Sequence, residues 1–266
     1  MGRSKFIYKF IMMFYKPYQL LEKSPLLKHN DSEENTSGHM IPINTVVREG
    51  KNIVLPLQIL RPLIESSECV AIMSECLCRR GEGCTTYPQD LGCLLLGSAA
   101  RDLHPGLGRI VSSDEAIVHA ENALQLGLVP LILHNEFDAW IWGIDYRRMM
   151  NVCFCCDCCC AVRRNIRNHL SRGFFKNIHR LPGLTVSTND RCTGCGLCVE
   201  ECLASAIEIE QEKAIIDQLK CKGCGRCITR CPEDAISMSL DPTSDPIRNL
   251  LKIYGQRTSV GFSEGD

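Results

Sequence analysis

Two cysteine runs decide the fold of this chain: Cys192-Thr-Gly-Cys195-Gly-Leu-Cys198-Val-Glu-Glu-Cys202 and Cys221-Lys-Gly-Cys224-Gly-Arg-Cys227-Ile-Thr-Arg-Cys231-Pro232. Both have the spacing Cys-x2-Cys-x2-Cys-x3-Cys, and the second run repeats the first 29 positions later, since Cys192 recurs as Cys221. The glycines of the first run, Gly194 and Gly196, recur as Gly223 and Gly225. Glycine permits the positive φ angles that a tight loop needs, and amide groups turned inward by such a loop offset negative charge. The spacing therefore predicts two short loops that wrap metal centres.

This spacing is typical of cysteine runs that hold [4Fe–4S] clusters, in which the fourth cysteine of each run ligates the cluster of the other run. The stretch resembles a two-cluster ferredoxin domain. The resemblance implies one cluster held by Cys192, Cys195, Cys198 and Cys231, and a second held by Cys221, Cys224, Cys227 and Cys202. Leu203 departs from the pattern, because a proline is expected after Cys202, but the change removes no ligand. A pair of four-cysteine zinc sites is the alternative, and the two matching runs with a closing Cys-Pro disfavour it.

The composition of the whole chain sets further bounds. Its 266 residues are enough for two domains, and the ferredoxin-like stretch needs only a small part of them. The formal net charge of −1 argues against a general nucleic-acid binder. With 19 cysteines and no cleavable signal peptide, we expect a cytoplasmic protein in a reducing compartment, whose thiols are ligands rather than disulfides. Because oxygen destroys exposed clusters, we also expect an anaerobic source.

A second cysteine-rich region lies upstream of these runs. It contains Cys76, Cys78, Cys84 and Cys93, and then Cys153, Cys155, Cys156, Cys158, Cys159 and Cys160. Six thiols in eight positions are a redox liability unless something binds them. We therefore expect a further metal site here, either a third iron–sulfur cluster or zinc. The alternative is a reactive dithiol that exchanges with a disulfide substrate. Cys69 stands apart, and a single buried cysteine is usually an inert small hydrophobe.

The local geometry of this region can be predicted only in outline. In an extended strand, Cys156, Cys158 and Cys160 would share one face, and Cys153, Cys155 and Cys159 would share the other. The neighbouring arginines are expected to lower the pKa of the thiols; they are Arg79, Arg80, Arg163 and Arg164. Three histidines are weaker ligand candidates, because a lone histidine is more often a core or surface group; they are His104, His119 and His134.

Several upstream stretches widen the resemblance. They are Cys76-Leu-Cys78-Arg79, Gly92-Cys93-Leu94, and residues 111–116, 127–129 and 151–160. Over residues 42–240 the chain resembles a group of proteins named simply as 4Fe–4S binding proteins. The resemblance implies an iron–sulfur redox protein and names no substrate.

Two N-terminal stretches differ from the rest of the chain. Residues 6–21 are apolar and aromatic with interspersed lysines, and the run is too short to span a bilayer, which needs about 20 predominantly apolar residues. This run could make peripheral contact with a membrane surface as a basic amphipathic segment, or it could pack as a helix on the protein's own core. Residues 30–38 are polar and predict a linker or loop.

Local signals predict several elements elsewhere. A capping box at residues 112–115 opens a helix that ends at Gly127, and residues 128–133 predict a strand. Residues 207–209 and 214–217 predict a hairpin. Residues 161–180 carry six Lys or Arg and no acid. This basic segment could steer an acidic redox partner, such as a ferredoxin or an oxidoreductase subunit, or it could be an ordinary solvated face.

Together these features predict an α+β protein. We expect an N-terminal segment and linker at 1–40, a cysteine-rich α/β domain at 41–182, a ferredoxin-like 2[4Fe–4S] domain at 183–240 and a tail at 241–266. The expected function is that of an electron carrier or electron-transfer subunit with two [4Fe–4S] clusters. The alternative is an oxidoreductase whose upstream cysteine site reduces a disulfide or small molecule with electrons from these clusters. The sequence shows no nucleotide loop, flavin fingerprint or acid–base pair, which favours the carrier; a substrate-sized pocket beside residues 153–160 would favour the enzyme.

Overall fold

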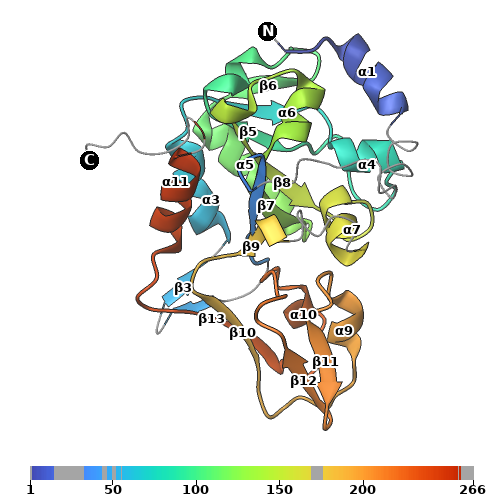
Figure 1. Ribbon diagram of the computed structural model, residues 1–266, viewed down its shortest axis with the longest axis vertical. Coiled ribbons are helices and arrows are strands. Elements are labelled where there is room, and N and C mark those ends of the chain that lie inside the picture. Colours follow the sequence, from blue (N-terminus) through green and yellow to red (C-terminus); the bar gives the residue numbers. More distant parts are fainter. Residues whose placement is uncertain are drawn as a thin grey trace.

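The computed structural model describes residues 2–14, 33–43, 47–49, 52–54, 56–168, 176–256 and 258. The largest of its sheets has seven strands in the order β6-β4-β5-β8-β7-β1-β9 (Figure 1). Its strands are β1 (Thr36–Met40), β4 (Val70–Met73), β5 (Leu94–Leu96), β6 (Gly108–Val111), β7 (Val129–Asn135), β8 (Met150–Cys155) and β9 (Ile178–Arg180). All neighbouring pairs are antiparallel except β1 and β9, which are parallel.

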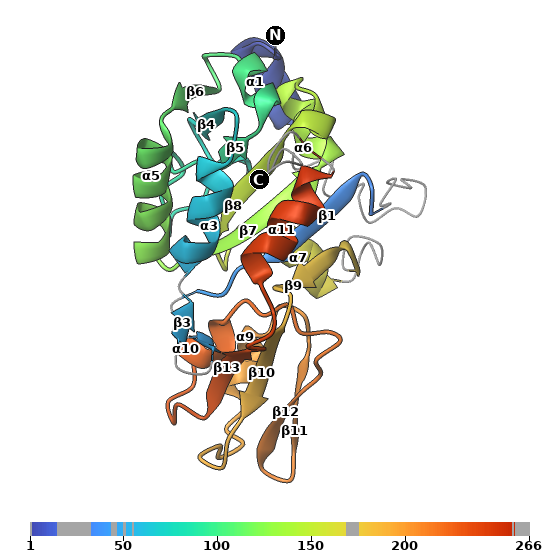
Figure 2. The same ribbon diagram turned by 90° about the vertical axis from the view of Figure 1, so that its left-hand side faces the viewer.

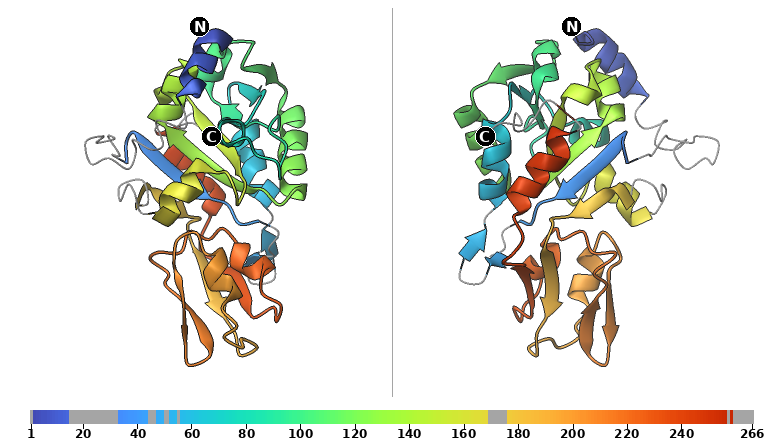
Figure 3. Two further views of the ribbon diagram at one scale, coloured as in Figure 1. Left: turned by 90° about the vertical axis from the view of Figure 1, so that its right-hand side faces the viewer. Right: turned by 60° about the vertical axis from the view of Figure 1, so that its left-hand side comes forward.

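Helices cover both faces of this sheet, so its central strands are apolar on both sides. In β4, Val70 and Ile72 belong to one core, whereas Ala71 and Met73 belong to the other. Figure 2 shows α5 (Ser113–Gln125), α3 (Pro56–Glu65) and α11 (Pro246–Gly255) side by side over the first core. The left view of Figure 3 shows the reverse side, where α1 (Lys5–Met13) and α6 (Glu136–Trp142) lie over the second core. The alternation of side chains along each strand thus gives the molecule its layers.

The helix predicted from a capping box is confirmed as α5. Ser112 Oγ accepts a hydrogen bond from the N–H of Glu115 at 3.2 Å, which satisfies one of the unpaired donors at the start of the helix. The helix ends before Gly127, whose φ of 73° lies in the left-handed region. The strand predicted to follow is confirmed as β7.

The apolar N-terminal run forms α1 over Lys5–Met13, and residues 15–21 of that run lie outside the described part. Tyr8 is 3% exposed and packs into the second core, which agrees with a helix that packs on the protein's own core. Among the described residues, no helix has the length and apolar character needed to cross a membrane.

The C-terminal part forms a smaller sheet and a hairpin. The sheet has the order β10-β13-β2-β3, and the hairpin pairs β11 with β12 as predicted. The strands are β10 (Leu184–Thr188), β13 (Ile236–Leu240), β2 (Val47–Glu49), β3 (Asn52–Val54), β11 (Ile207–Glu210) and β12 (Lys213–Ile216). Short helices α9 (Leu197–Glu201) and α10 (Arg226–Thr229) complete this part. Two of its four sheet strands therefore come from the N-terminal part of the sequence, and the expected α+β class is confirmed.

Two expectations for local structure are wrong. The polar stretch at 30–38 is expected to be a linker or loop, and residues 33–35 do form a turn, but Thr36–Met40 is the buried strand β1; residues 30–32 lie outside the described part. Gly38 lets β1 lie close to β7, because a Cβ there would be 2.8 Å from the carbonyl oxygen of Ile132. The extended strand considered for 153–160 ends at Cys155, and residues 157–159 form a turn that leads to α7 (Ala161–Asn168).

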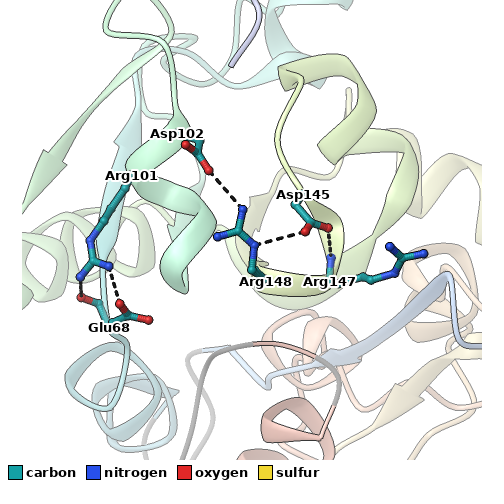
Figure 4. Close-up of polar contacts among 6 residues, drawn as sticks. All are labelled: Glu68, Arg101, Asp102, Asp145, Arg147 and Arg148. Carbon is teal, nitrogen blue, oxygen red and sulfur yellow. Dashed lines mark hydrogen bonds and ion pairs between the residues drawn. The ribbon is translucent and has the colours of Figure 1, made fainter. Parts of the chain in front are cut away.

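A network of surface ion pairs ties together the loops at one end of the large sheet (Figure 4). Arg148 lies 3.3 Å from Asp102 and 3.2 Å from Asp145, so it joins the short 3₁₀ helices η1 (Ser98–Asp102) and η2 (Tyr146–Arg148). Arg101 pairs with Glu68, which precedes β4. These groups are exposed to solvent, so each pair adds little stability by itself.

Candidate metal centres

The two C-terminal cysteine runs fold into two copies of one structural unit. Each unit is a loop followed by a short helix, and the helices α9 and α10 begin after Gly196 and Gly225, with φ angles of 81° and 84°. The positive φ expected at these glycines is therefore confirmed. The repeat extends to residues other than glycine, because Ser205 and Asp234 occupy equivalent positions with φ angles of 47° and 46°.

Backbone amides point at the cysteine sulfurs in both units. The N–H of Ala206 donates to Cys202 Sγ at 3.3 Å, and the N–H of Ala235 donates to Cys231 Sγ at 3.3 Å. Cys192 Sγ and Cys221 Sγ accept similar bonds from Ala214 and Gly223, at 3.3 and 3.4 Å. Hydrogen bonds from N–H groups favour the thiolate form of a cysteine, which is the form that binds metal.

The eight cysteines line two cavities. One cavity is lined by Cys192, Cys195, Cys198 and Cys231, and we call it the outer cysteine site because Cys195 is exposed. The other is lined by Cys202, Cys221, Cys224 and Cys227, and we call it the inner cysteine site. In each cavity the fourth cysteine of one run lies with the first three of the other run. This is the crossed arrangement that the resemblance to two-cluster ferredoxins implies.

Leu203, which stands where a proline was expected, is 2% exposed and packs into the first core. Burial raises the pKa of the Cys224 and Cys227 thiols. These thiols therefore need a bound cation to become thiolates at neutral pH, and binding releases their protons.

The comparison with protein families bears directly on this part of the chain. Residues 191–235 match a family model described as a 4Fe-4S dicluster domain. The chain is a 4Fe–4S binding protein. The matched segment, called the dicluster domain below, contains every cysteine of the outer and inner sites and confirms a ferredoxin-type domain in the C-terminal part of the fold. No curated protein and no solved structure matches the chain.

The dicluster domain contacts the upstream part of the molecule through the inner site. The N–H of Ile43 donates to the carbonyl oxygen of Cys224 at 3.3 Å. Arg226, between two inner-site cysteines, lies 2.8 Å from Asp157, which stands between two upstream cysteines. Sequence reasoning did not single out this ion pair. The sequence offers only a partial signal for it, because Asp157 is the single charged residue of the run at 153–160, whereas the run at 221–231 carries three basic residues beside its cysteines, namely Lys222, Arg226 and Arg230.

Arg163 of α7 also faces the inner site. Its side chain is 5% exposed and interacts electrostatically with Cys224. Its Nε and Nη1 have no hydrogen-bond partner within the described part of the chain. A buried guanidinium with unpaired donors is costly, and a negatively charged group at the inner site would satisfy it.

The ten upstream cysteines separate into two groups, a division that the sequence did not indicate. The first group, which we call the compact site, is Cys84, Cys156, Cys158 and Cys159, whose Sγ atoms all lie within 4.8 Å of one another. The other six form what we call the thiol chain, in which each thiol contacts the next in the order Cys153, Cys93, Cys76, Cys78, Cys160 and Cys155. The structure therefore places two candidate centres where the sequence predicted one site.

Hydrogen bonds between thiols dominate the electrostatics of the thiol chain. The bond with Cys160 is the main cause that raises the pKa of Cys78, and the bond with Cys153 is the main cause for Cys93. Cys76 accepts bonds from both Cys78 and Cys93, which lower its pKa. The six thiols therefore cannot all ionise together unless a cation is bound among them.

The effect of the neighbouring arginines on the pKa of the thiols differs from the expectation. Arg79 is 1% exposed and donates to the carbonyl oxygens of Phe154, at 2.9 Å, and of Leu91. It interacts with Cys76 and Cys93 of the thiol chain and with Cys156 of the compact site, so it lies between the two groups. Arg80 and Arg164 instead pair with Glu75 and Glu82. The expected lowering of thiol pKa is therefore wrong for Cys78 and Cys93, whose pKa is raised, although Arg79 does contribute to the lowered pKa of Cys76.

Asp138 is a titratable group beside the thiol chain that sequence reasoning missed. It lies in α6 and accepts a hydrogen bond from Asn151 Nδ2 at 3.1 Å. Burial, with a smaller contribution from Cys76, raises the pKa of Asp138 to about 7. No local signal marks this residue, because only the packing of α6 against β8 brings it near the cysteines.

The weaker ligand candidates bond to the backbone instead. His104 Nδ1 accepts from the N–H of Gly106 at 2.9 Å, His119 Nε2 lies 2.8 Å from the Gly92 carbonyl oxygen, and His134 Nδ1 lies 3.1 Å from that of Met149. Cys69 is buried in the second core, and no other cysteine of the described residues is among the groups that shift its pKa.

A wider cavity opens beside the inner site. Its lining includes Cys221 and four basic residues, namely Lys176, His179, Arg180 and Lys222. Arg180 Nη1 donates to Gln218 Oε1 at 2.6 Å, and burial lowers the pKa of Lys222 to about 8. Three of these residues, Lys176, His179 and Arg180, belong to the basic segment at 161–180, of which residues 169–175 lie outside the described part.

Proposed function

We propose that this protein transfers single electrons through two [4Fe–4S] clusters. The outer cluster would be held by Cys192, Cys195, Cys198 and Cys231, and the inner cluster by Cys202, Cys221, Cys224 and Cys227. The observation that carries the proposal is the pair of cavities, each lined by three cysteines of one run and the fourth of the other. The N–H···S bonds and the left-handed glycines suit the same ligand sets.

The positions of two cysteines support a direction of electron transfer from the surface to the interior. A [4Fe–4S] cluster takes up and releases one electron at a time, at a potential that hydrogen bonding and solvent exposure set. Cys195 brings the outer site to the surface, whereas Cys224 brings the inner site against the upstream part. We propose that electrons enter at the outer site and pass inward.

The thiol chain is the proposed end of this route. Arg163 faces Cys224 with its side chain, and its backbone N–H bonds to Cys160 of the thiol chain. In the described part of the chain, no three of these six sulfurs gather within 4.8 Å of one another. This spread suits a polynuclear cluster better than a single ion, because each ligand of a cluster can bind a different iron. We therefore propose a third iron–sulfur centre on the thiol chain.

The proposed division into domains follows the same sites. A cysteine-rich domain at 41–182 would carry the upstream centres, and a two-cluster domain at 183–240 would carry the outer and inner sites. The strands β2 and β3 cross this division, because they complete the sheet of the second domain.

The proposed partner is a redox protein with an acidic surface, such as a ferredoxin or an oxidoreductase subunit. The basic cavity beside Cys221 supports this choice, since opposite charge steers encounter and fixes orientation.

The same cavity supports a second candidate, an oxidoreductase that reduces a small anionic molecule there. The enzyme alternative was expected to need a pocket beside residues 153–160, whereas this cavity lies beside the inner site.

The test is the amount of iron and acid-labile sulfide per chain in anaerobically purified and reconstituted protein. We expect about 12 irons and an equal amount of sulfide per chain, which corresponds to three [4Fe–4S] clusters. Cys198→Ser, Cys227→Ser and Cys76→Ser should each lose about four irons, one cubane's worth, and Cys69→Ser is the matched control that should lose none.

Two other results would change the proposal in different ways. About eight irons, unaffected by Cys76→Ser, would remove the third centre and leave the two-cluster carrier. Fewer than about four irons would reject the two-cluster proposal itself.

A further inference from the structure

The compact site differs in geometry from the outer and inner sites. Within the described residues, it is the one group of three or more potential ligands whose ligand atoms all lie within 4.8 Å of one another. Cys84 Sγ and Cys158 Sγ are 3.6 Å apart. The cysteines of the dicluster domain instead surround two cavities. One chain therefore contains two kinds of four-cysteine arrangement.

The size of the compact site matches a single ion. A tetrahedral ion with metal–sulfur bonds of about 2.3 Å holds its four sulfurs about 3.8 Å apart. In a [4Fe–4S] cube the four cysteines bind different irons at separate corners, so their sulfurs lie farther apart. The fact that all four sulfurs of the compact site lie within 4.8 Å of one another agrees with the first case.

The local backbone supports four thiolates at this point. Cys84 follows α4 (Leu77–Glu82) after Gly83, whose φ of 67° turns the chain. Its sulfur accepts hydrogen bonds from the backbone N–H groups of Thr86 and Tyr87. In the turn after β8, the N–H of Cys159 donates to Cys156 Sγ at 3.3 Å. Hydrogen bonds of this kind orient the ligands of a metal and reduce their negative charge.

The compact site is accessible to a metal ion from solvent, and a buried arginine lies near it. Cys158 is exposed and Cys159 is half-buried, whereas Cys84 and Cys156 are buried. The buried Arg79 interacts electrostatically with Cys156 and offsets part of the charge of a four-thiolate site.

We propose that Cys84, Cys156, Cys158 and Cys159 bind one tetrahedral metal ion of the zinc type, separate from the iron–sulfur centres. Four sulfurs in a tetrahedron select zinc or a single iron among the common metals. The ion joins the end of α4 to the turn between β8 and α7. That turn also carries Asp157, which pairs with Arg226 of the dicluster domain, so the ion stabilises the contact between the two parts. This inference does not rest on the proposed electron transfer.

The test compares metal content in the full chain and in cysteine variants. We expect about one zinc per chain, which fills one four-cysteine site, in the wild type and in the control Cys69→Ser. Cys84→Ser and Cys158→Ser should lose it, while iron and sulfide stay unchanged. Because Cys158 is exposed, its variant tests the site even if Cys84→Ser fails to fold. Cobalt added in place of zinc should give the visible bands of a tetrahedral thiolate complex in the wild type and lose them in Cys158→Ser.

The other outcomes are distinct. One iron in excess of sulfide, lost in Cys158→Ser, would support the single-ion site with iron in place of zinc. Loss of about four irons together with four sulfides in Cys158→Ser would show a cluster and overturn the inference. Retention of zinc in both variants would overturn it as well. Failure of the proposed electron transfer would look different, since iron and sulfide would be missing while zinc remained.

Discussion

Arg163 is buried in α7 with two nitrogens, Nε and Nη1, that find no hydrogen-bond partner among the described residues. Its guanidinium interacts electrostatically with Cys224 of the inner site, and its N–H bonds to Cys160 of the thiol chain. A positive charge beside a cluster favours the reduced, more negative state, because the added electron is attracted to it. This residue is therefore placed to set the potential of the inner site.

We expect Arg163→Met to make the potential of the inner cluster more negative by on the order of 60 mV, equivalent to about 1.4 kcal/mol for a one-electron couple. Arg163→Lys keeps the charge but not the planar donors, so its shift should be smaller. A redox titration followed by electron paramagnetic resonance measures both. An unchanged potential in Arg163→Met would mean that the side chain does not contact the cluster.

For single residues, the sequence predicts some candidate ligands and misses others, and the reason is physical. The eight cysteines of the dicluster domain follow from their spacing, because each loop holds its ligands within a few residues. The sequence placed Cys84 and Cys158 in one candidate metal region but could not select the four cysteines of the compact site, because Cys84 and Cys158 meet only when α4 packs beside the turn after β8. Asp138 was missed for the same reason.

Among the elements, local signals predicted those whose cause is local. The capping box at Ser112 predicted α5, and the polar turn between two short apolar runs predicted the β11–β12 hairpin. The strand β1 was missed, because Thr36–Met40 has the composition of a loop. Its neighbours β7 and β9 and the helix α11 bury it, and none of them is close in sequence.

The contact between β1 and α11 leads to a prediction about stability. His39 Nδ1 and the hydroxyl of Tyr254 form a buried hydrogen bond of 2.9 Å. We expect Tyr254→Phe to lower the free energy of unfolding by about 1 kcal/mol, the usual value for one buried hydrogen bond. Denaturant unfolding of the metal-loaded protein measures the change.

A double-mutant cycle separates this bond from general packing. Tyr254→Phe, His39→Leu and the double variant should show a coupling energy of about 1 kcal/mol, because both single changes remove the same bond. Additive effects would mean that the two side chains stabilise the protein independently.

For the whole molecule, the two sheets are built from interleaved parts of the sequence. The strands β2 and β3 lie before α3, yet β2 pairs with β13 in the C-terminal sheet. The strand β9 leads into the dicluster domain, yet it extends the large sheet. Local sequence signals do not reveal these partners, because the parallel pairing of β2 with β13 joins segments far apart in the chain.

This exchange of strands leads to a prediction for the dicluster domain. In Arg48→Pro the ring removes a backbone N–H from β2, an interior strand of the C-terminal sheet. The loss should cost about 1–3 kcal/mol and loosen β13, which follows Cys231. We expect faster loss of the iron–sulfur absorbance in air than in the wild type.

Arg48→Ala is the matched control, because it removes the side chain but keeps the N–H. Equal rates of cluster loss in Arg48→Pro and Arg48→Ala would show that the strand pair is dispensable for the clusters.

The pairing of β2 with β13 also constrains the order in which a growing polypeptide can mature. Translation delivers β2 and β3 early, and their partner β13 follows only after nearly the whole described chain has emerged. Domains usually fold as they are made, starting from the N-terminus. Here β2 and β3 cannot complete the C-terminal sheet until β13 has been synthesised, and the upstream thiols emerge before that sheet exists. We therefore expect insertion of iron and sulfide at the proposed inner cluster to be a late event in the biogenesis of this protein.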